Sequence, residues 1–408
     1  MGASFDLIVL GAGSGGYACA FRAAQLGFTV ALVEKDKVGG TCLHRGCIPT
    51  KAMLHAAEVA DSVRNGSQFG VHAAIDKIDL AGVVSYADGV VGRIHKGLSG
   101  LVGAHGITVI PGAGRLTQDH RRPTVTVGDQ TYQATHLVLA TGSYPRSLPE
   151  LQIDGTRILT SEQALRLDRL PASAIVLGGG VIGVEFASAW RSFGVSVTIV
   201  EALPRLVSGE DSSISAALER AFRRRKINVV AGATMARCRT TESGVRMELA
   251  DGQLLEAELM LVAVGRGPQT SDLGYEEAGV ELDDGFVRVN ERLQTSVPSV
   301  YAVGDLHGRA DLLAEMHRLI AADAASLTPG TGKVVVYLGD YVDRGLESRR
   351  VIDLLIKSPL EEFQAVHLLG NHDAWLLSFL VDPAIGPVWL RYGGDATMHS
   401  YGVQFGIA

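Results

Sequence analysis

The sequence has few cysteines and no excess of positive charge. It contains 4 cysteines in 408 residues, and Asp and Glu outnumber Lys and Arg by 44 to 37. In an intracellular chain, so few cysteines favour a catalytic use over a structural one. The net charge of −7 speaks against a nucleic-acid partner. The one basic run, Arg223 to Lys226, lies in a predicted helix from Ser212 to Lys226, where a solvated helix face is the simpler interpretation.

Long hydrophobic runs are also lacking. No apolar run reaches the ~20 residues that a bilayer-spanning helix requires. The chain enters a predicted strand at Phe5–Leu10 without the basic and apolar regions of a signal peptide. Met1 and Gly2 resemble the start of a myristoylation signal, but Asp6 stands where Ser or Thr is needed. We therefore expect no membrane partner and a cytoplasmic location.

Glycine is abundant, at 49 residues, and it gathers in turns that follow apolar strands. The strand at Phe5–Leu10 leads through a glycine turn at 11–16 and a helix at Ser14–Leu26 to a strand at Thr29–Glu34. The same order of elements returns in the segment 174–201. Continuous apolar strands that alternate with helices predict parallel sheets covered on both faces. The fold class is therefore α/β, with two nucleotide-binding domains.

Both glycine turns fit the pattern G-x-G-x-x-G. The first glycine permits a tight turn, the second lets the backbone approach a pyrophosphate, and the third permits close contact between helix and strand. The N-terminus of the following helix then faces the phosphate charge. A structural turn is the alternative, but the flanking strand and helix favour nucleotide binding. The predicted cofactor-binding residues are Gly11, Gly13 and Gly16 in the first turn and Gly178, Gly180 and Gly183 in the second.

An acidic residue closes the strand that follows each turn. Glu34 lies 18 residues after Gly16, and Glu201 holds the matching place in the second unit. A carboxylate at this place can accept hydrogen bonds from ribose hydroxyls. Because it would repel a 2′-phosphate, Glu201 favours NAD over NADP. Arg205 is four residues further on and not immediately beside it.

Cys42 and Cys47 form a C-x4-C pair at the start of a predicted helix. A helix N-terminus stabilises a thiolate, and two nearby thiols can cycle between disulfide and dithiol. Zinc binding is the alternative, but no second Cys/His pair lies nearby. Redox chemistry is therefore favoured for this pair. Cys19 and Cys238 are expected to be buried or inert.

In combination these motifs resemble the pyridine nucleotide-disulfide oxidoreductase family, and within it the dihydrolipoamide dehydrogenase branch. The match runs collinearly over residues 5–305, and Leu43 with the segment 48–51 resembles the lipoamide branch more than the glutathione or mercury branches. Besides the turns and the cysteines, the matching segments are Ala140-Thr141-Gly142, Glu185, Val264-Gly265-Arg266 and Tyr301 to Asp305.

The resemblance implies FAD in the first unit and NAD in the second. It places Cys47 against the flavin and lets Cys42 exchange with a small dithiol or lipoyl-carrying substrate. Lys51 and Glu185 would form an ion pair near the reactive nitrogen of the flavin. Hydride transfer requires the nicotinamide and flavin to stack, with the thiols on the other face of the flavin. Further cofactor contacts are implied for Thr141, Gly142, Arg266 and, at the ribityl chain, Asp305.

The resemblance also implies the domain order. Two Rossmann-like domains are expected, with an NAD-binding domain at 149–269 inserted into an FAD-binding domain at 1–148 and 270–305. The family then continues into a dimerisation domain, whose His, paired with a Glu, serves the partner's site as acid and base. No such motif is recognisable after Asp305. We therefore expect the family homodimer to lack its usual domain and lipoamide turnover to be weak.

A different set of motifs begins near residue 300. Polar clusters follow three predicted strands, at Val300–Val303, Lys333–Leu338 and Ala365–Leu368. Each cluster alone could be a capped turn, but carboxylate, imidazole and amide groups at consecutive strand ends suit two divalent metal ions. The candidate ligands are Asp305, His307, Asp340 and Asn371.

The segment 299–408 resembles the phosphoprotein-phosphatase-type metallophosphoesterases. The resemblance implies that Asp305 and His307 bind one metal ion, Asp340 bridges, and Asn371 binds the second, with Mn, Fe or Zn as the metals. The fold implied is a partial α/β metallophosphoesterase domain after the two nucleotide-binding domains.

Three further residues have roles by this resemblance. Arg344 would hold phosphate, and His372, oriented by Asp373, would protonate the leaving group. The family takes two more His ligands from later strands, and His399 does not lie in a matching motif. We therefore expect a truncated segment with poor metal affinity.

The strand at 300–305 fits both families. One strand cannot belong to two cores, and Asp305 cannot bind both ribityl hydroxyls and a metal ion. We infer a chimera, whether natural, engineered or an assembly error. The favoured function is a flavin- and NAD-dependent oxidoreductase that carries a phosphoesterase tail. A metal-dependent phosphatase with an N-terminal passenger, and a fusion in which neither site works, are the alternatives.

Overall fold

The structure is a computed structural model of the chain, and it divides into two compact units. The first comprises Met1–Ala278 and Leu282–Phe286, and the second comprises Gly279–Glu281 and Val287–Ala408. Among the described residues, no helix is long and apolar enough to cross a membrane. The structure describes residues 3–117, 122–210, 212–290, 292–303, 333–337, 363–367 and 397–398, with the backbone course alone for 333–337 and 363–367.

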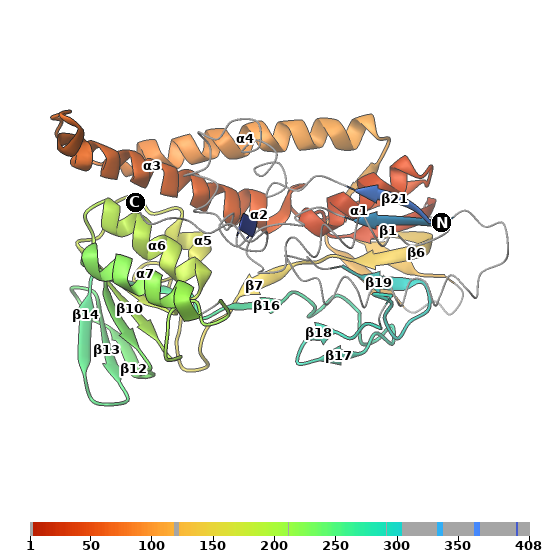
Figure 1. Cartoon of the computed structure of the whole chain (residues 1–408). Coiled ribbons are helices and arrows are strands. Elements are labelled where there is room, and N and C mark those ends of the chain that lie inside the picture. The colour runs from red at the N-terminus through yellow and green to blue at the C-terminus, as the bar shows by residue number, and fades with distance from the viewer. Residues whose placement is uncertain are drawn as a thin grey trace. The chain divides into compact units, whose positions relative to one another are not determined.

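The first sheet holds the first glycine turn at the end of its central strand (Figure 1). Its strands run in the order β3-β2-β1-β6-β5-β4. β1 pairs in parallel with both β2 and β6, whereas β4 and β5 are antiparallel to their neighbours. The bounds are β1 Ser4–Leu10, β2 Val30–Glu34, β3 Thr108–Pro111, β4 Gly114–Thr117, β5 Thr124–Val127 and β6 Gln130–Leu139, with α1 at Ser14–Gln25 between β1 and β2.

The residue pattern predicts a hairpin arm at Gln130–Gln133 and a separate buried strand at Leu137–Ala140. The structure instead has one strand, β6. It runs for 10 residues without a break. Up to Gln133 it pairs antiparallel to β5, and from Gln133 to Leu139 it pairs in parallel with β1. The apparent boundary in the sequence is a change of neighbour and of burial, because the strand leaves an exposed hairpin and enters the core.

The second sheet is parallel and runs in the order β11-β10-β9-β15-β8. An antiparallel sheet of β12, β13 and β14 follows β11 in the chain. The strand bounds are β8 Ile158–Thr160, β9 Ser173–Leu177, β10 Ser196–Glu201, β11 Asn228–Ala231, β12 Met235–Thr240, β13 Val245–Leu249, β14 Leu254–Ala257 and β15 Leu259–Val262. The helices are α5 Ser161–Ala164, α6 Val181–Ser192 and α7 Ser212–Arg224.

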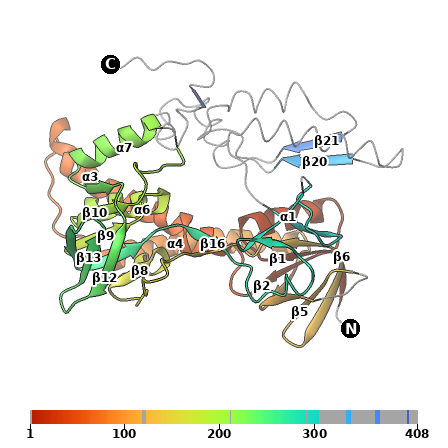
Figure 2. The same ribbon diagram turned by 90° about the horizontal axis from the view of Figure 1, so that it is seen from below.

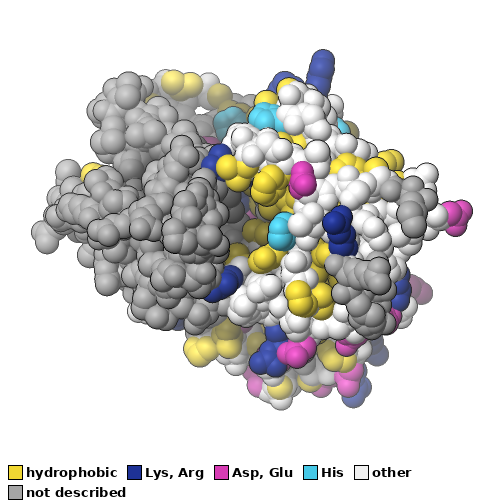
Figure 3. Space-filling model, turned by 90° about the vertical axis from the view of Figure 1, so that its right-hand side faces the viewer, with side chains coloured by type: hydrophobic (Ala, Val, Ile, Leu, Met, Phe, Trp, Pro, Cys, Tyr) yellow, Lys and Arg dark blue, Asp and Glu magenta, His cyan; other side chains and the backbone are white. Residues whose placement is uncertain are grey.

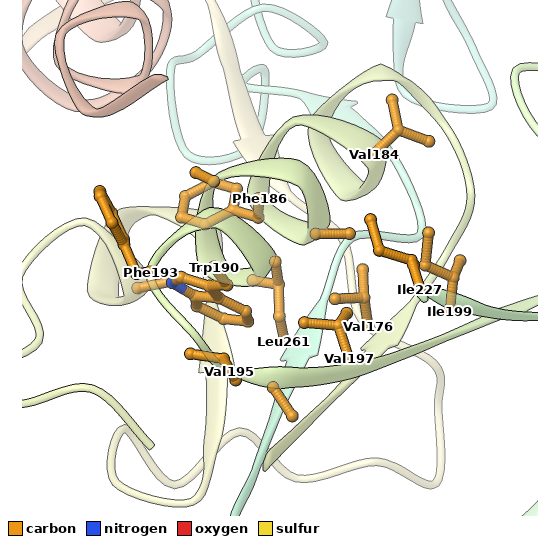
Figure 4. Packing of buried hydrophobic residues seen from close by; sticks show 14 of the residues in the cluster. Val176, Val184, Phe186, Trp190, Phe193, Val195, Val197, Ile199, Ile227 and Leu261 are labelled. Atoms are coloured by element: carbon orange, nitrogen blue, oxygen red, sulfur yellow. The ribbon is translucent and has the colours of Figure 1, made fainter. Parts of the chain in front are cut away.

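Buried side chains cover the second sheet on both faces, as the continuous apolar strands predict. Val176 of β9 belongs to a cluster with Phe186 and Trp190 of α6, whose rings meet edge to face with centroids 5.5 Å apart (Figure 4). Ile175, its neighbour in β9, belongs to a second cluster with Met247 of β13. One face is therefore covered by helices and the other by the antiparallel sheet.

Two long helices and a strand pair connect the two nucleotide-binding regions. α3 packs against both α4 and α6 (Figure 2). β7 and β16 pair antiparallel where the chain leaves the first region and later returns to it. The bounds are α2 Gly40–Arg45, α3 Cys47–Asn65, η1 Gly66–Phe69, α4 Leu80–Ala104, β7 Ser143–Pro145 and β16 Arg266–Pro268.

The remaining elements are short strands. β20 and β21 pair in parallel with Val335 opposite Ala365. They match the strands predicted at 333–338 and 365–368 to within two residues at each end. The bounds are β17 Leu282–Asp283, β18 Phe286–Val287, β19 Val300–Ala302, β20 Lys333–Tyr337 and β21 Phe363–His367.

Candidate functional site

The first glycine turn brings β1, α1 and the end of β6 into backbone contact. A Cβ atom on Gly16 would collide with the carbonyl oxygen of Gly11, and one on Gly11 would collide with that of Ala140. Gly13 caps α1 in extended conformation without a side-chain hydrogen bond, and nothing lies within 4 Å of the place of its Cβ. The open amides of this helix N-terminus suit a pyrophosphate.

The second turn repeats this geometry. A Cβ on Gly183 would collide with the carbonyl oxygen of Gly178, and one on Gly178 with that of Ala263. Gly180 caps α6 as Gly13 caps α1, again with open space beside it. The residues present therefore fit a dinucleotide at each turn.

Each predicted ribose-binding carboxylate lies over its own turn. Glu34 accepts hydrogen bonds from the amides of Ala12 (2.8 Å) and Asp36 (2.9 Å). Glu201 accepts from the amides of Gly179 (2.5 Å) and Leu203 (2.7 Å). The same anchoring at both sites holds the carboxylate at the strand end.

Arg205 is held by its own loop. Its guanidinium donates to the carbonyl oxygens of Ser208 (2.8 Å) and Glu210 (2.7 Å) and to Ser215 Oγ (2.7 Å). An arginine with these three partners is poorly placed to neutralise a 2′-phosphate, which agrees with the predicted preference for NAD. The sequence carried no signal for this, because the partners come from the loop and from α7.

The two cysteines meet where α2 ends and α3 begins. Cys47 is the first residue of α3, its side chain is exposed, and its thiol hydrogen-bonds to the half-buried Cys42. The hydrogen bond with Cys42, the charge of Lys51 and a backbone amide lower the pKa of Cys47 to about 6. The same hydrogen bond, burial and the Cys47 charge raise the pKa of Cys42 far above its ordinary value. At neutral pH, Cys47 is therefore the thiolate and Cys42 the thiol.

Lys51 lies one turn after Cys47 on the same face of α3. Its Nζ is 2.5 Å from Oε1 of Glu185 on α6, so the ion pair implied by the resemblance joins the two nucleotide-binding regions. Lys51 lowers the pKa of Cys47, and Glu185 raises it.

Two histidines hold the segment before Cys42. The carbonyl oxygen of Val38 accepts from Nε2 of His44 (2.9 Å) and from Nδ1 of His95 on α4 (3.0 Å). The two rings lie edge to face with centroids 5.0 Å apart. These contacts tie α2 to α4. Sequence reasoning missed them, because 51 residues separate the histidines and neither lies in a recognised motif.

Thr141 and Arg266 are fixed by contacts around β7 and β16. Thr141 Oγ1 donates to the carbonyl oxygen of Gln269 (2.7 Å) and lies 3.1 Å from the hydroxyl of Tyr275. Burial raises the pKa of Tyr275 to about 12. Arg266 donates to Ser143 Oγ (2.8 Å) and to the Ser143 carbonyl oxygen (2.7 Å). Gly142, between these anchors, has open space where a Cβ would lie.

The predicted metal and phosphate residues lie outside the described residues. In the described part of the chain, no group of three or more His, Cys, Asp or Glu side chains could hold a metal ion. These predicted residues are Asp305, His307, Asp340, Arg344, Asn371, His372 and Asp373.

Two family models match the chain. The model for pyridine nucleotide-disulphide oxidoreductases covers residues 5–325, and the model for calcineurin-like phosphoesterases covers residues 298–402. Both models therefore include residues 298–325, a longer overlap than the strand at 300–305 that the sequence motifs indicate. The two resemblances seen in the motifs are confirmed.

Known proteins agree with the first model. The chain is 41% identical over 339 residues to dihydrolipoyl dehydrogenase of Chlorobaculum parvum, covering 81% of this chain and 71% of that protein. It is 38% identical to dihydrolipoyl dehydrogenase of Bacillus subtilis, covering 76% and 69%. The crystal structure of LpdA from Mycobacterium tuberculosis matches with a TM-score of 0.69 and 30% identity, covering 74% and 68%. The chain belongs to the pyridine nucleotide-disulphide oxidoreductase family, as an NAD-dependent flavoprotein disulfide oxidoreductase similar to dihydrolipoyl dehydrogenase.

Proposed function

We propose that the chain passes hydride between NAD and the Cys42/Cys47 pair through FAD, and exchanges that pair with a small dithiol or lipoyl-carrying substrate. The observation that carries the proposal is the pair itself. One thiol has a pKa of about 6 at the start of a helix, and its neighbour has a raised pKa. Such a difference separates the two sulfurs into a leaving group, Cys47, and the sulfur that the substrate thiolate attacks, Cys42.

The cofactors are assigned by the two turns. FAD would bind at Gly11–Gly16 with Glu34, and NAD at Gly178–Gly183 with Glu201. Open helix N-termini at both turns support this assignment. We propose an FAD-binding domain at 1–148 and 270–305 and an inserted NAD-binding domain at 149–269. The pairing of β7 with β16, where the chain leaves and returns, supports these limits.

The cysteines perform the exchange. A substrate thiolate attacks Cys42 in the Cys42–Cys47 disulfide and releases Cys47 as a thiolate, because the sulfur with the lower pKa leaves faster. The second substrate thiol then displaces Cys42, which leaves an oxidised substrate and a reduced cysteine pair. Lys51 stabilises the charge on Cys47 throughout. When bound, FAD relays the two electrons between this pair and the nicotinamide.

The spectrum of the purified full chain tests this proposal. We expect the absorbance of an oxidised flavin, which anaerobic NADH bleaches and NADPH bleaches much more slowly. A long-wavelength band is expected as the Cys47 thiolate packs against the flavin. A protein with no flavin absorbance, or with a flavin that NADH leaves oxidised, would contradict the proposal.

The C-terminal segment supports a second candidate function. Residues 298–402 match the calcineurin-like phosphoesterase model. Because β20 and β21 are parallel, their carboxyl ends lie at the same edge of the pair. Asp340 and Asn371 follow these two strands in the sequence. We propose that this segment binds divalent metal ions (Mn, Fe or Zn) and hydrolyses a phosphoester, with His372, Asp373 and Arg344 in the roles that the resemblance implies.

Phosphatase activity can be assigned by paired variants. With Mn²⁺ and an aryl phosphate, Asp340→Asn is expected to lower the rate of hydrolysis at least about a hundredfold, because the bridging carboxylate is lost. Cys47→Ser is the matched control and should leave hydrolysis unchanged. Hydrolysis that survives Asp340→Asn, or that needs no metal ion, would refute the assignment.

The location, the oligomeric state and the partners of the chain are proposed from its relatives and from its surface charge. We propose a cytoplasmic homodimer, as expected for the dihydrolipoyl dehydrogenase relatives. Acidic and basic side chains are interspersed over the coloured part of the face in Figure 3. This distribution offers no single-sign field on that part of the face for a nucleic-acid partner.

A further inference from the structure

A second polar contact joins α3 to α6, ten residues beyond Lys51 on α3. Oδ2 of Asp61 accepts a hydrogen bond from Ser192 Oγ at 2.6 Å, and Nη2 of Arg225 lies 3.3 Å from the same oxygen. Ser192 is the last residue of α6 and is 3% exposed, and Arg225 follows the end of α7. The contact therefore joins three helices from both nucleotide-binding regions.

Arg225 is an exception to the prediction that the basic run 223–226 is a solvated helix face. Arg223, Arg224 and Lys226 are exposed, but Arg225 is half-buried. It donates to Ser188 Oγ (2.6 Å), to the Ser188 carbonyl oxygen (2.9 Å) and to Ser192 Oγ (2.6 Å). Burial lowers the pKa of Arg225, and the Asp61 charge opposes that shift. Helical periodicity could not show this, because the partners lie on other helices.

The geometry of this contact distinguishes it from an exposed ion pair. Exposed pairs contribute little because solvent screens them and their side chains remain mobile. Here a carboxylate, a buried hydroxyl and a guanidinium share charge-assisted hydrogen bonds, which are directional. Asp61 also pairs with Arg64 on its own helix (3.0 Å), so removing Asp61 is the change that leaves the half-buried Arg225 without its carboxylate. The contact therefore defines a position more than it adds stability.

The two polar contacts flank one apolar contact. Met53 and Ala57 of α3 belong to the same buried cluster as Phe186 and Trp190 of α6. At 1.5 Å per residue, the second contact lies about 15 Å beyond Lys51 along α3 and about 10 Å beyond Glu185 along α6. Two separated polar contacts and an apolar surface between them restrict both sliding and rotation of the helices.

We propose that Asp61, Ser192 and Arg225 are positioning residues, which hold α3 against α6 so that Glu185 stays paired with Lys51 beside Cys47. α3 begins at Cys47, and α6 begins at the second glycine turn. The contact therefore also relates the thiol to the turn that we assign to NAD. The catalytic consequence of this role rests on the proposed function, whereas the effect on the pKa of Cys47 does not depend on it.

The groups around Cys47 predict the direction of the effect. Cys42 on α2, Lys51 on α3, Glu185 on α6 and Arg266 on β16 all interact with it electrostatically. The hydrogen bond with Cys42 does not depend on α6. If the contact at Asp61 is lost and α6 moves away from α3, Lys51 stays one turn from Cys47 on the same helix, whereas Glu185 moves away. Because Glu185 raises the pKa of Cys47, that pKa falls.

Site-resolved alkylation of the reduced full chain tests this. Iodoacetamide is applied across about pH 5 to 9, where the thiolate fraction of Cys47 changes. Trypsin cleaves after Arg45, so Cys42 and Cys47 fall in different peptides. The pKa of about 6 sets the expected midpoint for the unaltered chain. We expect Asp61→Ala to lower it by about one unit, which raises labelling of Cys47 at pH 5 about fivefold.

Three further variants give the test its controls. Ser192→Ala, which removes only a hydroxyl, should lower the midpoint less and decides the question if Asp61→Ala does not fold. Asp61→Asn keeps an acceptor for Ser192 and should stay near the unaltered value. Glu256→Gln removes the Arg246–Glu256 pair between β13 and β14 and should leave the midpoint unchanged.

The outcomes separate this inference from the proposed function. An unchanged midpoint in both Asp61→Ala and Ser192→Ala, even with a lower melting temperature, would overturn the positioning role. The alkylation needs no flavin, so it answers independently of cofactor binding. Bleaching by NADH, measured on the same samples, should slow in Asp61→Ala. If even the unaltered chain shows no bleaching, it is the proposed function that fails.

Discussion

Cys47→Ser is expected to abolish disulfide exchange by at least about a thousandfold while flavin reduction by NADH continues. The serine hydroxyl cannot form a disulfide, and it does not ionise at neutral pH. Hydride transfer from NADH to FAD needs neither sulfur. NADH-dependent reduction of lipoamide, compared with reduction of an artificial electron acceptor, measures the two steps separately. The long-wavelength thiolate band should vanish.

Cys42→Ser and Cys19→Ser are the matched controls for this prediction. Cys42→Ser should lose exchange equally but keep the thiolate band, because a serine hydroxyl can still hydrogen-bond to Cys47. Cys19→Ser should change neither activity, since burial raises the pKa of that thiol to about 11. Exchange that persists in Cys47→Ser would show that another group carries the chemistry.

Adding one methyl group to each glycine turn is expected to separate the two nucleotide sites. A Cβ on Gly16 has no room against Gly11, and one on Gly183 has none against Gly178. Gly16→Ala should therefore yield protein without flavin. Gly183→Ala should retain flavin, but its bleaching by NADH should slow by at least about a hundredfold, because the turn must open where the dinucleotide binds. Flavin content and stopped-flow bleaching are the measurements.

Gly97→Ala is the control for a Gly→Ala change at a site with room for the added methyl group. Gly97 lies within α4, and no atom lies within 4 Å of the place of its Cβ. Alanine there should leave both cofactors bound and stabilise the helix by about 0.5 to 1 kcal/mol. If Gly16→Ala bound flavin as well as Gly97→Ala does, the assignment of FAD to the first turn would be wrong.

The sequence alone was sufficient for features that depend on neighbours along the chain. The glycine turns, their closing carboxylates and the C-x4-C pair are each encoded within a few residues. The reason is local: a turn that cannot hold a Cβ, a strand end and a helix start all leave a short pattern. The fold class and the family followed from the order of these patterns, and the comparisons confirmed both.

Tertiary structure decided what depends on residues far apart in the chain. The Lys51–Glu185 ion pair could be expected only from the family resemblance, and its partners are 134 residues apart. The contact of Tyr275 with Thr141 and the ion pair of Asp61 with Arg225 lie in no recognised sequence motif. Burial and hydrogen-bond partners are set by which elements pack together, and periodicity along one helix does not contain that information. The sequence therefore determined which groups carry the chemistry, and packing determined their charge states and what holds them in place.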